Sequence, residues 1–328
     1  MRLIAYFIIS LFFLSGCIED YDLKLPDAES RLVVEGLITN QPGPYYIHLT
    51  KSKIESFKSP DEEYTDNAEP IIDAMVIILD DSNQVDTLKL IDFDVKEYKY
   101  DYRFGYFKIL LNEYGELIDT LFLKDPSGFN HRGFYKTSRL KGISGHTYFM
   151  KIIHNDKIYE SSAYMPPVPE IDSIGYLKKI MEKDGQEFFI PLIYFKEPQM
   201  IDNYYLIQLS DDISLRSGYG SSNWPFSIFS DDFLEPYVSG LNISLGTNPR
   251  GIEYPFYMEG DSIYVALSSL TKEGFNYYKA LLEQFGNDGG AYKPTPASPI
   301  GNISNGGLGL FRASAISEKG TYIQRTSN

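Results

Sequence analysis

Histidines and clustered acidic residues are the side chains of this sequence that could hold a metal ion or transfer protons. The four histidines form no His-Glu-x-x-His motif and do not fall at metal-ligand spacing; they are His48, His131, His146 and His154. Acidic clusters at 61–66, 211–212 and 231–235 offer oxygen ligands for calcium, but none follows a calcium-loop pattern. We therefore predict no catalytic, cofactor-binding or metal-binding residues, and calcium at an acidic loop stays an open alternative.

The single cysteine, Cys17, could act as an acyl acceptor. Residues 1–16 begin with Met1-Arg2 and continue with an uncharged apolar stretch, which is the pattern of an export signal. The stretch is shorter than the about 20 apolar residues that span a bilayer. Leu14-Ser15-Gly16-Cys17 resembles the lipobox of bacterial lipoproteins, in which a peptidase cuts before the cysteine. We predict cleavage after Gly16 and acylation of Cys17, since two acyl chains anchor a protein stably.

The charge balance of the chain is strongly acidic. The full sequence has a net charge of −15, and loss of Arg2 with the signal leaves 29 basic residues against 45 acidic ones. Such a surface repels phosphate backbones, so we expect no nucleic-acid partner. Within the expected tether, residues 17–30, the acidic residues Glu19, Asp20 and Asp22 resemble a signal for export to the cell surface. The alternative is an ordinary solvated tether.

Residues 31–165 have the pattern of a β-sandwich of immunoglobulin size. Short alternating runs end in polar turns, as at 31–38 and 45–50, where Tyr45, Ile47 and Leu49 share one face. Further strands are expected at 74–79, 85–90, 98–111 and 117–123, and a hairpin at 147–164 with its turn at Asn155-Asp156. Residues 166–169 contain three prolines and predict a linker.

Residues 170–328 predict a second β-rich domain that carries one amphipathic helix at 271–285. A glycine- and proline-rich loop follows over 286–309, and a final strand at 310–316 is expected to close the sheet of this domain. The fold class is thus mainly β. Because exposed loops on a rigid base suit protein recognition, one interpretation makes this loop a partner-binding surface. Its candidate residues are Tyr292, Pro294, Pro296 and Pro299.

Two segments at opposite ends of the chain resemble the signatures of a known family. The first is Leu32–Thr50, LVVEGLITNQPGPYYIHLT, and the second begins with Phe275–Gln284, FNYYKALLEQ. The second continues through Gly289-Gly290, Pro294, Pro296, Pro299, Gly301-Asn302-Ile303, Gly307 and Gly309. Together they resemble a family of Bacteroidota outer-membrane lipoproteins, domain of unknown function four-two-four-nine.

The resemblance implies a surface or outer-membrane lipoprotein encoded beside a TonB-dependent receptor, with no catalytic residues to transfer. We therefore expect a lipid-anchored protein, exposed at the cell surface, that acts as an accessory or binding module of such a receptor. One alternative is a structural or assembly component of the outer membrane. The other is a surface hydrolase, because carboxylate pairs of glycoside hydrolases are set by the fold and leave no sequence motif.

Overall fold

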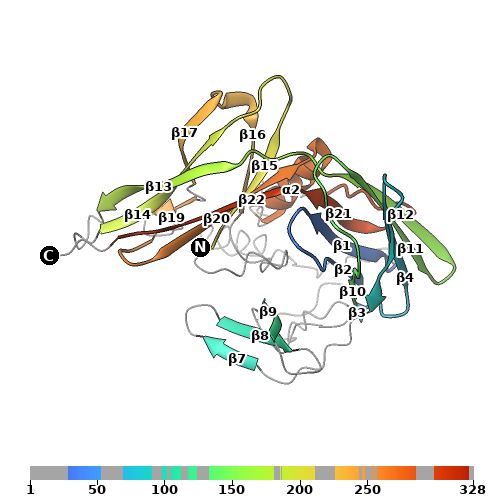
Figure 1. The fold of residues 1–328 in the computed structure, drawn as a ribbon. Coiled ribbons are helices and arrows are strands. Elements are labelled where there is room, and N and C mark those ends of the chain that lie inside the picture. Colours follow the sequence, from blue (N-terminus) through green and yellow to red (C-terminus); the bar gives the residue numbers. More distant parts are fainter. Residues whose placement is uncertain are drawn as a thin grey trace, which may run out of the picture. The chain divides into compact units, whose positions relative to one another are not determined.

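The computed structural model describes most of the chain after residue 28. The described residues are 29–52, 69–90, 98–101, 105–111, 117–123, 133–180, 185, 187–210, 226–243, 246–247, 253–254, 257–285 and 299–324. They are mainly β, with several antiparallel sheets and one α-helix, so the predicted fold class is confirmed (Figure 1).

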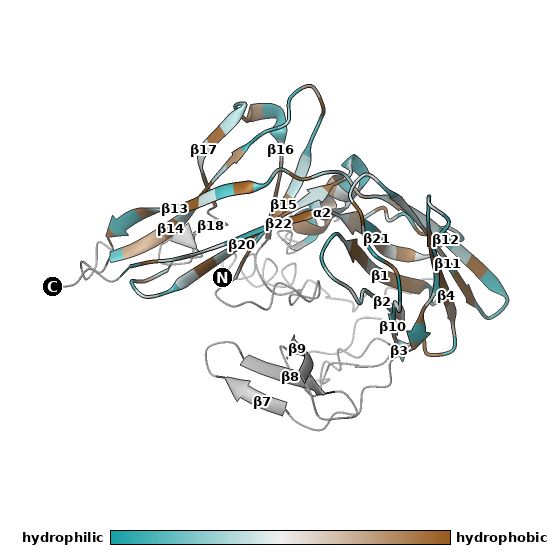
Figure 2. Cartoon of the chain, viewed as in Figure 1, coloured by the Kyte–Doolittle hydropathy of each residue, from teal (hydrophilic) through white to brown (hydrophobic). Residues whose placement is uncertain are grey.

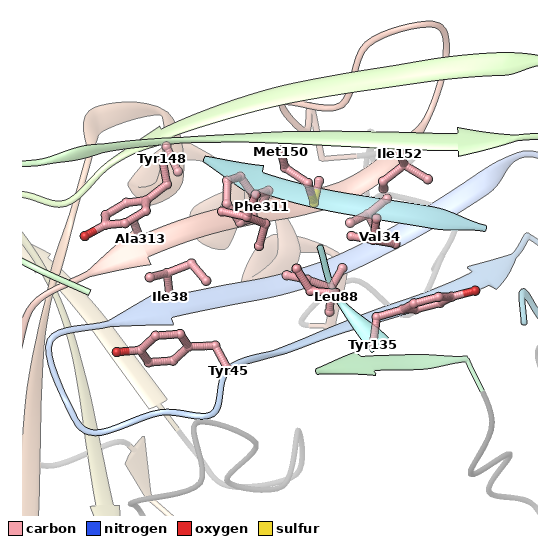
Figure 3. Packing of buried hydrophobic residues seen from close by; sticks show 14 of the residues in the cluster. Val34, Ile38, Tyr45, Leu88, Tyr135, Tyr148, Met150, Ile152, Phe311 and Ala313 are labelled. Atoms are coloured by element: carbon pink, nitrogen blue, oxygen red, sulfur yellow. The ribbon is translucent and has the colours of Figure 1, made fainter. Parts of the chain in front are cut away.

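Two sheets enclose the first hydrophobic core. The first sheet has the order β21-β1-β2-β10-β6, with β3 beside β2. Its strands are β1 (Leu32–Thr39), β2 (Tyr46–Lys51), β3 (Glu69–Pro70), β6 (Lys89–Leu90), β10 (Phe134–Lys136) and β21 (Leu308–Ser314). The second sheet has the order β12-β11-β4-β5 and contains β4 (Met75–Asp80), β5 (Val85–Thr87), β11 (Thr147–His154) and β12 (Lys157–Tyr164). Figure 3 shows their packing, with Val34 from β1, Met150 from β11 and Phe311 from β21 in one cluster.

The alternation read from the sequence explains these strands. Tyr45, Ile47 and Leu49 are all buried, as predicted for one apolar face, and β2 pairs antiparallel with β1. The hairpin of β11 and β12 is also confirmed, and its turn residues Asn155 and Asp156 have φ of 49° and 59°. Two successive residues with positive φ match the type I′ turn, whose twist suits a hairpin.

Two expected strands are each divided in the structure. Residues 85–90 form β5 and β6, which belong to different sheets, and Leu88 between them is buried in the first core. Residues 98–111 form β7 (Tyr98–Asp101) and β8 (Gly105–Leu111), which make a three-stranded sheet with β9 (Leu117–Leu123).

A second hydrophobic core lies between two further sheets. One has the order β13-β14-β17 and contains β13 (Ile171–Ile180), β14 (Glu187–Lys196) and β17 (Tyr237–Asn242). The other has the order β16-β15-β20-β22 and contains β15 (Tyr204–Ser210), β16 (Phe226–Ser230), β20 (Ser262–Leu270) and β22 (Ile316–Tyr322). The short strands β18 (Gly246–Thr247) and β19 (Glu253–Tyr254) pair with each other. Val168, in the predicted linker, packs against both cores.

The predicted helix is present as α2 (Lys272–Phe285). The Thr271 hydroxyl accepts a hydrogen bond from the Gly274 amide at 3.1 Å, so it caps the helix N-terminus. The expected apolar face is used for packing. The Phe275 ring lies 5.0 Å from that of Tyr204, and the Tyr278 ring lies 5.4 Å from that of Phe226.

The last predicted strand belongs to a different sheet from the one expected. Residues 310–316 were expected to close the second sheet system, but β21 pairs in parallel with β1 of the first core, from Val33–Leu308 to Thr39–Ser314. The chain then enters β22, which pairs with β20 of the second core. The range 170–328, expected as a second domain, therefore includes a segment that completes the first core. When two strands far apart in the sequence pair in parallel, no turn or pattern near either strand indicates which partner it will have.

Candidate partner-binding site

The residues predicted for anchoring and export lie outside the described part of the chain. This holds for Gly16 and Cys17, and for the acidic residues Glu19, Asp20 and Asp22. Lipidation and surface export therefore stay predictions.

The predicted partner loop is described only from Pro299 onward; Tyr292, Pro294 and Pro296 lie outside the described residues. The end of this loop is bound into the fold. Ile303 is buried in the first core, and the Asn302 side chain makes two hydrogen bonds with the Phe311 backbone, at 2.7 and 2.9 Å. Gly309 has φ +91°, and a Cβ there would collide with the Val34 carbonyl. Residues 301–309 thus have a structural role, and partner binding stays a prediction for 292–299.

Neither a metal centre nor a membrane-spanning helix is found in the part of the chain that the structure describes. No group of three or more His, Cys, Asp or Glu side chains there could hold a metal ion. Of the helices described, none is long and apolar enough to cross a bilayer.

Two loops of the second core expose large apolar side chains, and we call these residues the apolar tip. Met200 and Ile201 lie between β14 and β15, and Phe233 ends the short 3₁₀ helix η2 (Asp231–Phe233) between β16 and β17. Met200 is fully exposed, Phe233 is 94% exposed and Ile201 is 52% exposed. Single exposed apolar residues are common, but three on two joined loops are the kind of cluster that marks a contact site.

Hydrogen bonds join the two loops of the tip. The Asn203 amide donates to Asp231 Oδ2 at 2.9 Å, and the Asp231 amide donates to the Asn203 carbonyl at 3.1 Å. The Ser230 hydroxyl donates to Asp232 Oδ2 at 2.6 Å. Asp231 and Asp232, part of one acidic cluster considered for calcium, therefore serve as local hydrogen-bond acceptors.

A buried carboxyl group lies beneath the tip. Glu197 at the start of the first loop is only 2% exposed, and its Oε1 accepts a hydrogen bond from Asn203 Nδ2 at 2.8 Å. The Tyr205 hydroxyl lies 2.9 and 3.0 Å from the two carboxylate oxygens. The Glu197 amide donates to the Pro236 carbonyl at 3.0 Å, which ties this strand end to the second loop. A buried polar network that is satisfied in this way fixes the loops above it.

Burial dominates the electrostatics of this network. It raises the pKa of the Glu197 carboxyl, while the hydrogen bonds from Tyr205 and Asn203 oppose the shift and the charge of Asp231 adds to it. Burial, followed by the adjacent Glu197, raises the pKa of the Tyr205 hydroxyl, which therefore stays a donor. Because Glu197 is closed off from solvent, its chemistry is that of a loop support and not of an acid or base that reaches a substrate.

The backbone at the tip is held in an uncommon conformation. Met200 has φ +69°, in the left-handed region that a residue with a Cβ rarely adopts. Such a conformation persists only where the surrounding structure imposes it, and such positions gather at functional sites. The network of Glu197 and Asn203 supplies that constraint, so Met200 is presented by a supported loop.

The sequence carries only a weak signal for this site. Gln199-Met200-Ile201-Asp202 places two apolar residues between polar ones after an apolar strand, which marks a loop with exposed apolar side chains. Phe233 is more than 30 positions away, and the sequence gives no indication that the two loops meet.

In the described residues, these features define a mainly β protein with two cores, one α-helix and an exposed apolar tip. Residues 18–320 match the model of the family described as "Domain of unknown function (DUF4249)", and the chain belongs to this family. The match to domain of unknown function four-two-four-nine that the sequence predicts is thereby confirmed. A comparison with curated proteins gives no match, so neither comparison identifies an enzyme family.

Proposed function

We propose that this protein is a lipid-anchored lipoprotein of the outer-membrane surface that serves as a binding module of a TonB-dependent receptor system. The anchor and the location are supported by the signal pattern of residues 1–16, by Cys17 and by the acidic tether. The receptor is supported by the family resemblance. The observation that carries the binding role is the apolar tip on its buried Glu197 support.

The charges around the tip favour a protein over a bilayer as its target. Asp202, Asp232 and Glu235 are exposed beside the three apolar residues, and Lys196 is the exposed basic residue on the adjoining strand end. Insertion into a membrane would require these carboxylates to lose their hydration and to approach anionic headgroups. A protein pocket with an apolar floor and a basic rim would match both the apolar side chains of the tip and the carboxylates beside them. The charges on such a rim would mainly increase the rate of association.

The anchor is tested by Cys17→Ala in the full-length chain. Since the thiol is the acyl acceptor, we expect the variant to lose labelling by a clickable fatty acid and to accumulate as unprocessed or soluble protein. Fluorescent gel detection and membrane fractionation measure this. Retention of the variant in the outer-membrane fraction would show that Cys17 is not the anchor.

The tip is tested by the double substitution Met200→Ser and Phe233→Ser. Both side chains are exposed, so thermal stability should change by about 0.5 kcal/mol or less. If they are central contacts, partner binding should weaken by about 2 kcal/mol or more, roughly 30-fold. The measurement is recovery of the receptor with the native lipoprotein from solubilised outer membrane, quantified against wild type.

The matched control is Ile180→Ser at the end of β13, where a 63% exposed isoleucine is removed away from the tip. The control should recover the receptor as wild type does. Equal recovery by the tip variant would rule out the tip as the contact, and Pro299 with its preceding loop would become the candidate surface.

A further inference from the structure

The outward face of the β12-β11-β4-β5 sheet is unusually apolar. Strand alternation buries one side of each strand in the first core and turns the other side outward. Eight of the outward residues are apolar, and they are Met75, Ile77, Leu79, Val85, Phe149, Ile153, Ile158 and Tyr164. We call this surface the outer face; Figure 2 shows hydrophobic positions along β4 and β11. Antiparallel sheets with a solvated face normally carry polar residues there.

Register places these side chains side by side. Phe149 lies opposite Leu79, which lies opposite Val85, so one apolar row crosses three strands. Ile153 lies opposite both Met75 and Ile158 and forms a second row. Met75, Val85 and Ile158 are 52, 50 and 46% exposed. The outer face therefore carries two apolar rows, which Ile77 on β4 joins, and not a scatter of single residues.

The outer face has no net charge. Its charged residues are Lys151 and Glu160, which lie directly opposite each other across β11 and β12, between the two apolar rows. The whole chain has a net charge of −15, so two copies repel each other over most orientations. A face that balances its own charges is where a second copy can approach without that cost. Under a twofold axis, Lys151 of one copy would meet Glu160 of the other.

The open edge of β12 is covered, which directs association to the face. The Ser304 amide donates to the Glu160 carbonyl at 2.9 Å, and the Glu160 amide donates to the Ser304 hydroxyl at 2.7 Å. Asn302 Nδ2 donates to the Ser162 carbonyl at 3.1 Å. With these backbone groups occupied, strand addition at the β12 edge is blocked, as natural sheets often arrange.

The dimensions suit an isologous contact. Strands about 4.8 Å apart and eight residues rising about 3.4 Å each give an outer face of roughly 400 Å². The eight apolar residues cover part of this area, and contiguous apolar patches of a few hundred Å² on monomers are often functional. Two such faces can form the centre of a dimer interface of ordinary size, about 800 Å² per partner, when a polar rim completes it. Sheets pack face to face about 10 Å apart.

We infer that the protein forms a twofold homodimer in which the outer faces of two copies pack together, with Lys151 of each copy beside Glu160 of the other. The contact is independent of the apolar tip, which belongs to the second core. A dimer of this kind therefore leaves the tip of each copy free for another protein.

The test uses the full-length acylated lipoprotein in detergent, with micelles in large excess, and measures the protein mass per particle by light scattering. Wild type should contain two chains per particle. Phe149→Glu places a carboxylate in the apolar row and should weaken association at least 30-fold, giving one chain per particle with an unchanged melting temperature. This variant has the same anchor and so controls for chance sharing of micelles. Phe233→Ser, in the tip, should stay dimeric.

Exchanging the charges of Lys151 and Glu160 tests whether the two outer faces contact each other. Lys151→Glu and Glu160→Lys should each be monomeric, because each homodimer would oppose like charges. Mixed together, the two variants should form a one-to-one heterodimer, since every contact then joins opposite charges. If the outer face takes no part in association, the mixture shows no such rescue. Wild-type particles with one chain up to about 100 μM, or a mixture that stays monomeric, would overturn the proposal.

Discussion

Replacing Phe311 with alanine is expected to lower the free energy of unfolding by about 3–5 kcal/mol, the range for a large aromatic side chain in a packed core. Phe311 is completely buried, and its strand β21 is the element whose position in the first core was not anticipated (Figure 3). The neighbouring strand β1 and the facing strand β11 are each hydrogen-bonded to strands on both sides. They therefore cannot move far to fill the cavity that the missing ring would leave. Chemical denaturation of the purified protein measures the loss.

The control for this prediction is Leu310→Ala on the same strand. Leu310 is only partly buried and points away from the first core cluster, so its removal should cost clearly less, about 1 kcal/mol. If Phe311→Ala and Leu310→Ala lose the same stability, β21 does not complete the core as the structure describes.

Asp86→Ala is expected to destabilise the protein by about 2–3 kcal/mol, since it removes a buried carboxylate and leaves three backbone amides, among them the buried amide of Leu140, without their acceptor. Oδ2 of Asp86 accepts hydrogen bonds from the amides of Ser138, Arg139 and Leu140 at 2.7, 2.6 and 2.9 Å. Burial acts to raise the pKa of this carboxyl, but the three donors together outweigh it and hold the pKa below its ordinary value.

The pH dependence of the Asp86 effect follows from that lowered pKa. A carboxyl with a lower pKa in the folded state contributes stability above its unfolded pKa of about 3.9 and loses it as the pH falls toward the folded value. The difference between wild type and Asp86→Ala should therefore be full at neutral pH and shrink in acid. Thr87→Ala, at the exposed neighbouring residue, should change little at any pH. A loss for Asp86→Ala that does not vary with pH would contradict the role given to its charge.

Local patterns were sufficient for much of the fold. The burial of Tyr45, Ile47 and Leu49 follows from alternation, and the turn at Asn155-Asp156 follows from residues that tolerate positive φ. The helix at α2 was visible from its apolar period. Each of these features depends on residues within a few positions of one another.

Features that depend on distant contacts could not be read in the same way. Leu88 divides an apparent single strand because its side chain fills a core whose walls come from elsewhere in the chain. Met200 and Phe233 form one tip only because Asn203 and Asp231 meet. No turn close in sequence connects β1 to its parallel partner, so the sequence pattern alone predicts that β21 belongs to the sheet of its sequence neighbours.

The late position of β21 fixes the order in which the molecule can be completed. Arg31 and Gly306 are joined by a hydrogen bond although they are 275 residues apart, and the strands beside them pair in parallel. Because β1 precedes β21 by more than 250 positions, the first sheet has an unfilled edge and an open core until residues 308–314 are in place. Closing such a long loop is slow, and until it closes the incomplete core exposes apolar surface that is prone to aggregation. Since β22 then completes the second sheet, both cores close only when residues 308–322 are present, and a chain cut short before residue 308 loses a strand from each.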